Sequence, residues 1–179
     1  MKNIKGFEGR EREARNIFCH NGFCYELIPE YGKFPAGFDY TMYSGGYCDV
    51  DDNLYLFSRD TDRPIVVLDA EGRYVRDFGK GLFKEVHSLC VTPNSTLLCT
   101  DTALHVVREL SIKGELIRDF GNLGVPSDSG YEKDVWRRMM REGKIVATDL
   151  AFDKGWSFWM SIQTIKRAAP PFNRPTGVA

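Results

Sequence analysis

"DNLYLFSRDTDRPIVVLDAEGRYVRDFG" (52–79) is followed 42 residues later by a related stretch, "NSTLLCTDTALHVVRELSIKGELIRDFG" (94–121). Aligned without gaps, the two stretches share a glycine, Gly72 with Gly114, and the complete ending Arg-Asp-Phe-Gly. Internal repeats of about 40–50 residues are typical of propeller blades and of helical solenoids. The content of each repeat must therefore decide between the two architectures.

Each repeat reads as short strands separated by turn residues. The segments "LYLFSR", "PIVVLD" and "RYVRDF", and their counterparts "TLLCTD", "HVVREL" and "ELIRDF", are rich in β-branched and aromatic residues. Neither repeat has room for a helix pair. Adding "GGYCDV" before the first and "HSLCVT" before the second gives four strands per repeat, as in a propeller blade. We predict two adjacent four-stranded antiparallel blades within residues 40–121, with Phe78 and Phe120 in equivalent buried positions.

The composition excludes several classes of partner. The chain has 179 residues, long enough for one domain with a real core, and its 24 basic and 25 acidic residues nearly cancel. Neither sign of charge gathers into a long block, so the sequence does not indicate a surface for nucleic acid or for an anionic membrane. The N-terminus is charged where a secretory signal needs an apolar run, and no stretch approaches the about 20 apolar residues of a membrane span. We therefore expect a cytoplasmic protein with no nucleic-acid or membrane partner.

The cysteine pattern points the same way. Five cysteines make an odd count without a C-x-x-C pair, which favours reduced thiols over a disulfide framework. The stretch "CHNGFC" (19–24) looks like a ligand cluster, but no second pair completes it. We interpret it as an ordinary loop before a strand.

Several stretches resemble a known family. "DVDDNLYLFSR", "VVLDAEGRYVRDFGKGLF", "TDTALHVVREL" and "PPFNRPTGVA" are similar to the NHL-repeat six-bladed β-propellers, and more closely to the branch related to peptidyl-α-hydroxyglycine α-amidating lyase. The resemblance covers about residues 24–122 and 161–179, and "LFKEVH", "TDTALH" and "NRPTGVA" carry it most specifically. Six blades need more residues than the chain has. The resemblance thus implies the N-terminal part of such a propeller, as a partial gene product or a chain truncated relative to its relatives.

This resemblance implies a domain organisation. The expected fold is all-β: a partial β-propeller of about two four-stranded blades plus the opening strand of a third, "FNRPTGVA" (172–179). Residues 1–23 form an N-terminal extension, and residues 24–179 form the incomplete propeller. An insertion at about 122–171 interrupts the repeat. It is expected to be partly helical, with its three tryptophans (Trp136, Trp156 and Trp159) packing it onto the blades rather than stacking on a ligand.

The resemblance also assigns possible site residues. In the lyase, three histidines from different blades hold a zinc ion in the central channel, and His87 of "LFKEVHSL" matches the first. Arg59 matches an arginine that faces substrate near the metal. An ion pair with Asp60, Asp62 or Asp101 is its structural alternative. Tyr43 and Leu89 match positions whose backbone carbonyls hold a structural calcium ion.

The other histidines are expected to have no metal role. His105 is expected to hydrogen-bond within its blade, and His20 lies in the weakly matched N-terminus. Strand alternation predicts that His87, Leu89 and Val91 share one face, with His87 toward the channel.

Two functions remain open. One is a zinc-dependent lyase that splits a C-terminal α-hydroxyglycine into an amide and glyoxylate. The other is a non-catalytic NHL-repeat propeller that acts as a scaffold and binds a protein or a ligand. In either case a peptide or small molecule could occupy the channel. Because only His87 can be placed as a zinc ligand, and the remaining ligands would follow residue 179, we predict that this chain by itself is not an active lyase.

Overall fold

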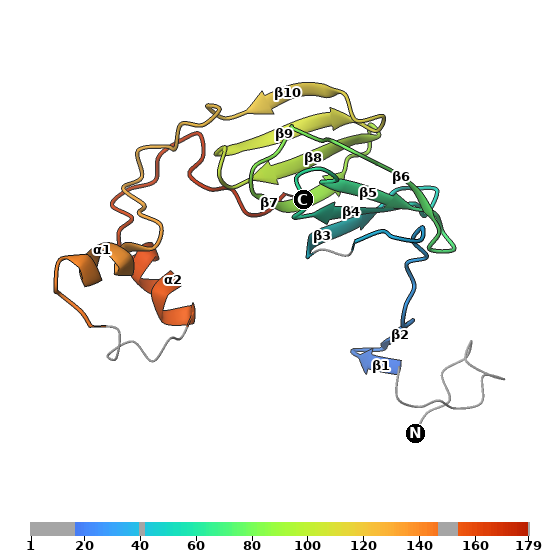
Figure 1. Ribbon diagram of the computed structural model, residues 1–179, viewed down its shortest axis with the longest axis horizontal. Coiled ribbons are helices and arrows are strands. Elements are labelled where there is room, and N and C mark those ends of the chain that lie inside the picture. The colour runs from blue at the N-terminus through green and yellow to red at the C-terminus, as the bar shows by residue number, and fades with distance from the viewer. Residues whose placement is uncertain (1–16, 40–41, 147–153, 179) are drawn as a thin grey trace.

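The computed structural model describes residues 17–39, 42–146 and 154–178, which are mostly β-structure (Figure 1). These residues form three antiparallel sheets, of two, four and four strands, and two short helices. The prediction of a mainly β chain is confirmed. No helix in the described part of the chain is long and apolar enough to cross a membrane.

The N-terminal sheet is a hairpin of β1 (Ile17–His20) and β2 (Phe23–Glu26). Asn21 and Gly22 form its turn with φ values of 49° and 87°, and both must be positive in the type I′ turn that suits a two-residue hairpin. Cys19 and Cys24 lie directly opposite each other and form a disulfide. The interpretation of residues 19–24 as a loop with reduced thiols is therefore wrong. Asn-Gly between two β-prone segments was the overlooked signal.

Two four-stranded sheets follow, each with its strands in chain order. Sheet I contains β3 (Tyr43–Cys48), β4 (Leu54–Ser58), β5 (Ile65–Leu68) and β6 (Tyr74–Phe78). Sheet II contains β7 (Val86–Val91), β8 (Thr96–Asp101), β9 (Val106–Ser111) and β10 (Leu116–Phe120). The prediction of two four-stranded antiparallel units is thus confirmed.

The strand registers show that the two repeats align only with a gap. Ile65 pairs with Phe78 in sheet I, and Val107 pairs with Phe120 in sheet II, which agrees with the 42-residue offset. The first two strands differ. Leu54 pairs with Cys48 and its equivalent Leu97 pairs with Val91, an offset larger by one residue. The loop between the second and third strands is one residue longer in sheet I, so the ungapped alignment is wrong over β4 and β8.

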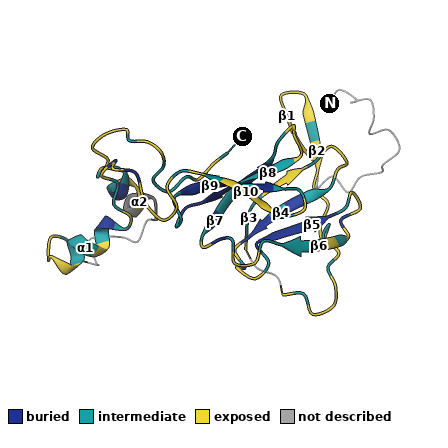
Figure 2. Ribbon diagram, turned by 90° about the horizontal axis from the view of Figure 1, so that it is seen from above, coloured by how far each residue is buried: buried dark blue, intermediate teal, exposed yellow. Residues whose placement is uncertain are grey.

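The core lies between the two sheets. Sheet I contributes Tyr55, Phe57, Ile65 and Val67, and sheet II contributes Val86, Leu89, Leu97, Cys99 and Leu110. Phe83, in the connection between the sheets, meets the Phe57 ring edge-on, with the ring centres 5.1 Å apart. Burying a side chain of this size stabilises the fold by about 1.5–3 kcal/mol. Figure 2 shows this burial concentrated in central strands such as β5 and β9.

A β-bulge interrupts the alternation of β7. Val86 pairs with Asp101 and Leu89 with Cys99, so two residues of β7, His87 and Ser88, face one residue of β8. Val86 and Leu89 consequently both reach the core between the sheets. Strict alternation would have put them on opposite faces, so the predicted grouping of His87 with Leu89 is wrong at this point.

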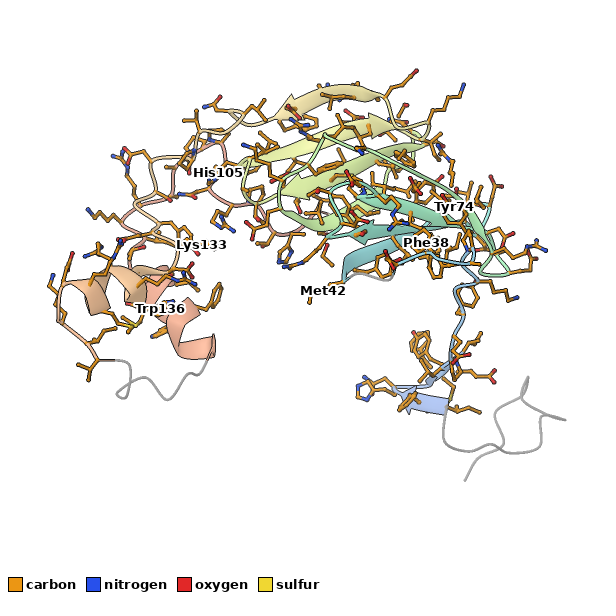
Figure 3. The ribbon with its side chains drawn as sticks, viewed as in Figure 1. Phe38, Met42, Tyr74, His105, Lys133 and Trp136 are labelled. Carbon is orange, nitrogen blue, oxygen red and sulfur yellow. A yellow bond between two sulfur atoms is a disulfide. The ribbon has the colours of Figure 1, made fainter. Side chains whose placement is uncertain are left out.

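The segment before sheet I packs on the outer end of that sheet. Lys33 forms a parallel bridge with Arg73, and the Tyr31 hydroxyl donates a 2.7 Å hydrogen bond to the Ala70 carbonyl. The Phe38 ring lies beside Tyr74, with the ring centres 5.6 Å apart (labelled in Figure 3). Residues 31–38 therefore cover the last hairpin of sheet I.

The predicted insertion contains α1 (Val135–Arg141) and α2 (Lys154–Ile162), which pack on each other away from the sheets (Figures 1 and 2). The prediction that its tryptophans anchor it to the sheets is wrong for Trp159, which is 58% exposed. Trp136 is half-buried beneath the Arg137 guanidinium, and the side chain of Trp156 lies outside the described residues.

Residues 172–178 do not form the predicted strand. They run back past β7 without a sheet partner among the described residues, and a strand needs such a partner for its backbone groups.

Candidate functional site

A pocket of about 660 Å³ opens between the sheets and the helical insertion. The sheets contribute one end of their strands, the insertion contributes the other side, and the C-terminal segment runs between them. The residues that line it are Arg59, Glu85, His87, Thr102, Ser127, Ser129, Tyr131, Lys133, Asp134, Phe158, Ser161, Ile162, Ile165, Arg167, Ala168, Ala169, Pro171, Phe172, Asn173, Arg174, Pro175 and Thr176. Two predicted site residues, Arg59 and His87, therefore share one cavity.

Arg59 follows directly after β4, where its backbone N–H donates a 2.9 Å hydrogen bond to the Met42 carbonyl. The residue is exposed, and within the described parts of the chain its guanidinium has no carboxylate partner. The three carboxylates considered for it bind elsewhere: Asp60 to Arg63 at 3.1 Å, Asp62 to Lys80 at 3.1 Å, and Asp101 to the backbone N–H groups of Lys84, Ala103 and Leu104. The ion-pair alternative is therefore wrong, and Arg59 is available to a ligand.

His87 lies in the bulge of β7. Its Nδ1 is 2.8 Å from the Thr176 carbonyl oxygen. A carbonyl can only accept, so Nδ1 carries the proton, and in the neutral ring Nε2 keeps its lone pair. The hydrogen bond fixes the ring against the C-terminal segment.

Glu85 joins three parts of the site. It lies just before β7 and accepts a 2.8 Å hydrogen bond from the Arg174 guanidinium, and the Lys133 ammonium of the insertion lies 3.5 Å away (labelled in Figure 3). Burial alone would raise the pKa of Glu85, but the hydrogen bond and charge of Arg174, with the charge of Lys133, lower it overall. Glu85 is therefore an anion that holds the C-terminal segment and the insertion to sheet II.

His105 occupies the turn between β8 and β9, outside the pocket lining, with a φ of 59°. Its Nδ1 accepts a 3.1 Å hydrogen bond from the Arg174 backbone N–H, so this nitrogen carries no proton (Figure 3). Burial, followed by the nearby charge of Arg174, lowers the pKa of His105 although Asp101 opposes the shift. The histidine thus has a structural contact, but with the C-terminal segment rather than with its own sheet.

The pocket has an excess of positive charge. Four cations, Arg59, Lys133, Arg167 and Arg174, line it with only two carboxylates, Glu85 and Asp134, whereas the whole chain has a net charge of −1. Arg174 and Lys133 share one carboxylate, and Arg167 pairs with the exposed Asp128 outside the lining. Such a cluster raises the local concentration of anions and favours their binding.

The predicted metal sites receive no support from the described residues. Among them, no group of three or more His, Cys, Asp or Glu side chains is placed to hold a metal ion. His87 alone does not fit a zinc site, and His20 lies on the N-terminal hairpin. Tyr43 pairs with Ser58 at the start of β3, and Leu89 is buried between the sheets. Calcium binding by their carbonyls stays a prediction.

Sequence reasoning missed the residues that assemble the pocket. Glu85 and Arg174 lie within "LFKEVH" and "NRPTGVA", but no sequence pattern links them to each other or to Lys133, and up to 89 residues separate the three. Their charges matter only because the insertion and the C-terminal segment fold back onto sheet II.

The comparisons with known proteins add no relative. No protein-family model matches the chain, and no curated protein matches it. The likeness to NHL propellers therefore stays a prediction.

Proposed function

We propose that this chain is a ligand-binding module of the propeller type, whose pocket takes the carboxylate end of a peptide. The observation that carries the proposal is the guanidinium of Arg59, which has no carboxylate partner among the described residues and lies in a cavity with excess positive charge. Arginine presents a planar array of donors that can bind both oxygens of a carboxylate. The cavity volume of about 660 Å³ is within the range of small-molecule sites.

A peptide end suits the remaining lining. Thr102, whose hydroxyl accepts a 3.3 Å hydrogen bond from the Arg174 guanidinium, and Ser129 both line the cavity, and hydroxyl groups can bond to amide groups. The propeller part of the proposal rests on the repeat and on the two similar four-stranded sheets, which pack face to face as neighbouring blades do. The site then belongs to the loops at one end of the blades, where ligand-binding residues often occur on a rigid scaffold.

A zinc-dependent amidating lyase is the second candidate. It is favoured by one observation: Arg59 and His87, which the resemblance assigns to substrate and to metal, line the same cavity. One histidine does not hold zinc usefully, and the described residues contain no group of three or more side chains placed to bind a metal. With zinc added, we expect no conversion of a peptidyl-α-hydroxyglycine to amide and glyoxylate. Turnover detected as glyoxylate release would reverse the order of the two candidates.

Calorimetric titration tests the binding proposal. N-acetyl-phenylalanyl-glycine should bind, and its C-terminal amide should bind at least about tenfold more weakly because a charged hydrogen bond is lost. Arg59→Met should weaken binding of the acid by about 10- to 100-fold and leave the amide unaffected. Arg141→Met is the matched control, since Arg141 is exposed on α1 and does not line the cavity. Equal affinity for acid and amide would refute the proposal.

A further inference from the structure

Helix α2 and the residues just after it contribute large apolar side chains to the cavity. Phe158 and Ile162 of α2, and Ile165 just after it, line the cavity at intervals of four and three residues. Such intervals place side chains on one face of a helix. α2 ends at Ile162, and the backbone N–H of Ile165 donates to the Ile162 carbonyl at 3.0 Å, which closes a tighter turn whose first and fourth side chains lie on the same side. Phe172 of the C-terminal segment extends this surface.

Two of these side chains are largely uncovered by the part of the chain that the structure describes. Phe158 is 62% exposed and Ile165 is 48% exposed, although both are large and apolar. Trp159, the next residue of α2, is similarly exposed, but it does not line the cavity. The exposure of Phe158 and Ile165 therefore leaves apolar area inside the cavity that a ligand can remove from water.

We propose that α2 forms an apolar wall that selects peptides with a bulky apolar side chain on the residue before the C-terminal one. The inference rests on the proposed function, because Arg59 must first hold the carboxylate. A ligand held by Arg59 and extending across the cavity reaches the face formed by Phe158, Ile162 and Ile165. The insertion then determines which peptide side chains bind, and Arg59, which follows β4 of sheet I, holds the carboxylate.

Two probes that differ only in the side chain test this wall. N-acetyl-phenylalanyl-glycine should bind about tenfold more tightly than N-acetyl-alanyl-glycine, because one aromatic side chain is removed from water. Phe158→Ala should reduce this preference to about twofold, and Phe158→Leu should give an intermediate value. Trp159→Ala should leave it unchanged. Because Phe158 is exposed, these substitutions should keep the circular-dichroism spectrum and melting temperature of the parent.

The outcomes test side-chain selection by α2 (the wall) separately from carboxylate binding by Arg59 (the anchor). If both probes bind equally, depend on Arg59 and ignore Phe158, the wall is refuted while the proposed function stands. If Trp159→Ala removes the preference as strongly as Phe158→Ala, α2 does not act through the cavity and the wall is again refuted. If neither probe binds, the anchor and the wall both fail.

Discussion

Sheets I and II have the same strand order, yet equivalent residues in them differ in burial. Phe78 and Phe120 end the last strand of their sheets, and each lies under the guanidinium of the arginine two residues before it. Phe78 packs against the core, whereas Phe120 is 39% exposed. The prediction of equivalent positions is right in register, and the prediction of equal burial is wrong. The difference arises because sheet II covers Phe78.

The turn of the last hairpin in each sheet also packs against a neighbouring segment of the chain. Gly72 and Gly114 occupy the turns, with φ values of 77° and 97°. A Cβ atom on Gly114 would lie 2.5 Å from the Phe78 ring of sheet I, and one on Gly72 would collide with the Tyr31 carbonyl oxygen. Residues 31–33 thus occupy, against sheet I, the place that sheet I occupies against sheet II. A repeat specifies its own strands, but its neighbours decide what is buried.

The largest expected effect concerns the two glycines. Gly72→Ala should lower the free energy of unfolding by about 2–4 kcal/mol, because it adds overpacking against backbone to the strain of positive φ. Gly114→Ala should cost less, since the Phe78 ring can shift more easily than a carbonyl. Urea denaturation measures both. Gly81→Ala is the control, because Gly81 has a φ of 78° and open space around it. A cost for Gly72→Ala no greater than that of Gly81→Ala would show that residues 31–33 do not press on the turn.

A smaller effect distinguishes the two phenylalanines. Phe78→Ala should cost about 1.5–3 kcal/mol because its ring packs against the core, and Phe120→Ala should cost less than about 1 kcal/mol. The arginine over each ring is common to both sites and cancels in the comparison. Chemical denaturation of the two variants measures the difference. Equal costs would mean that Phe120 is covered in solution, and the contrast between the sheets would disappear.

The smallest effect is a pH dependence confined to sheet II. Because the pKa of His105 is lowered in the folded chain, the unfolded chain binds more protons just below the ordinary value of 6.5. The stabilising contact with the Arg174 N–H is therefore fully present above about pH 6.5 and is lost as the pH falls through the lowered pKa. Arg63, in the corresponding turn of sheet I, pairs with Asp60 and stays charged over this range.

His105→Gln isolates this contribution. The difference in unfolding free energy between the parent and the variant, measured from about pH 8 to pH 5, should shrink on acidification, and other titrating groups cancel in that difference. Exchange of the Arg174 amide proton should also speed up in the parent at low pH, after correction for intrinsic exchange. A difference independent of pH would show that His105 does not hold the C-terminal segment through its neutral ring.

Much of the candidate site lay beyond sequence reasoning. The resemblance named Arg59 and His87, and the structure brings both to one cavity. Alternation misplaced residues around His87 because a bulge adds a residue to β7, and nothing in "VHSLCV" announces it. The Cys19–Cys24 disulfide was missed because the cysteine count was considered without the Asn-Gly turn that places the two thiols opposite each other.

Local sequence patterns specify the strands and turns of this chain. Period-2 patterns, β-branched residues and glycine turns act over a few residues, and they were enough to predict two four-stranded antiparallel units and a shared register for Phe78 and Phe120. Which of these two rings is covered, and which charges meet around Glu85, depends on how the sheets, the insertion and the C-terminal segment pack together. Burial and ion pairing depend on segments far apart in the chain, and local patterns contain no information about which distant surface will cover them.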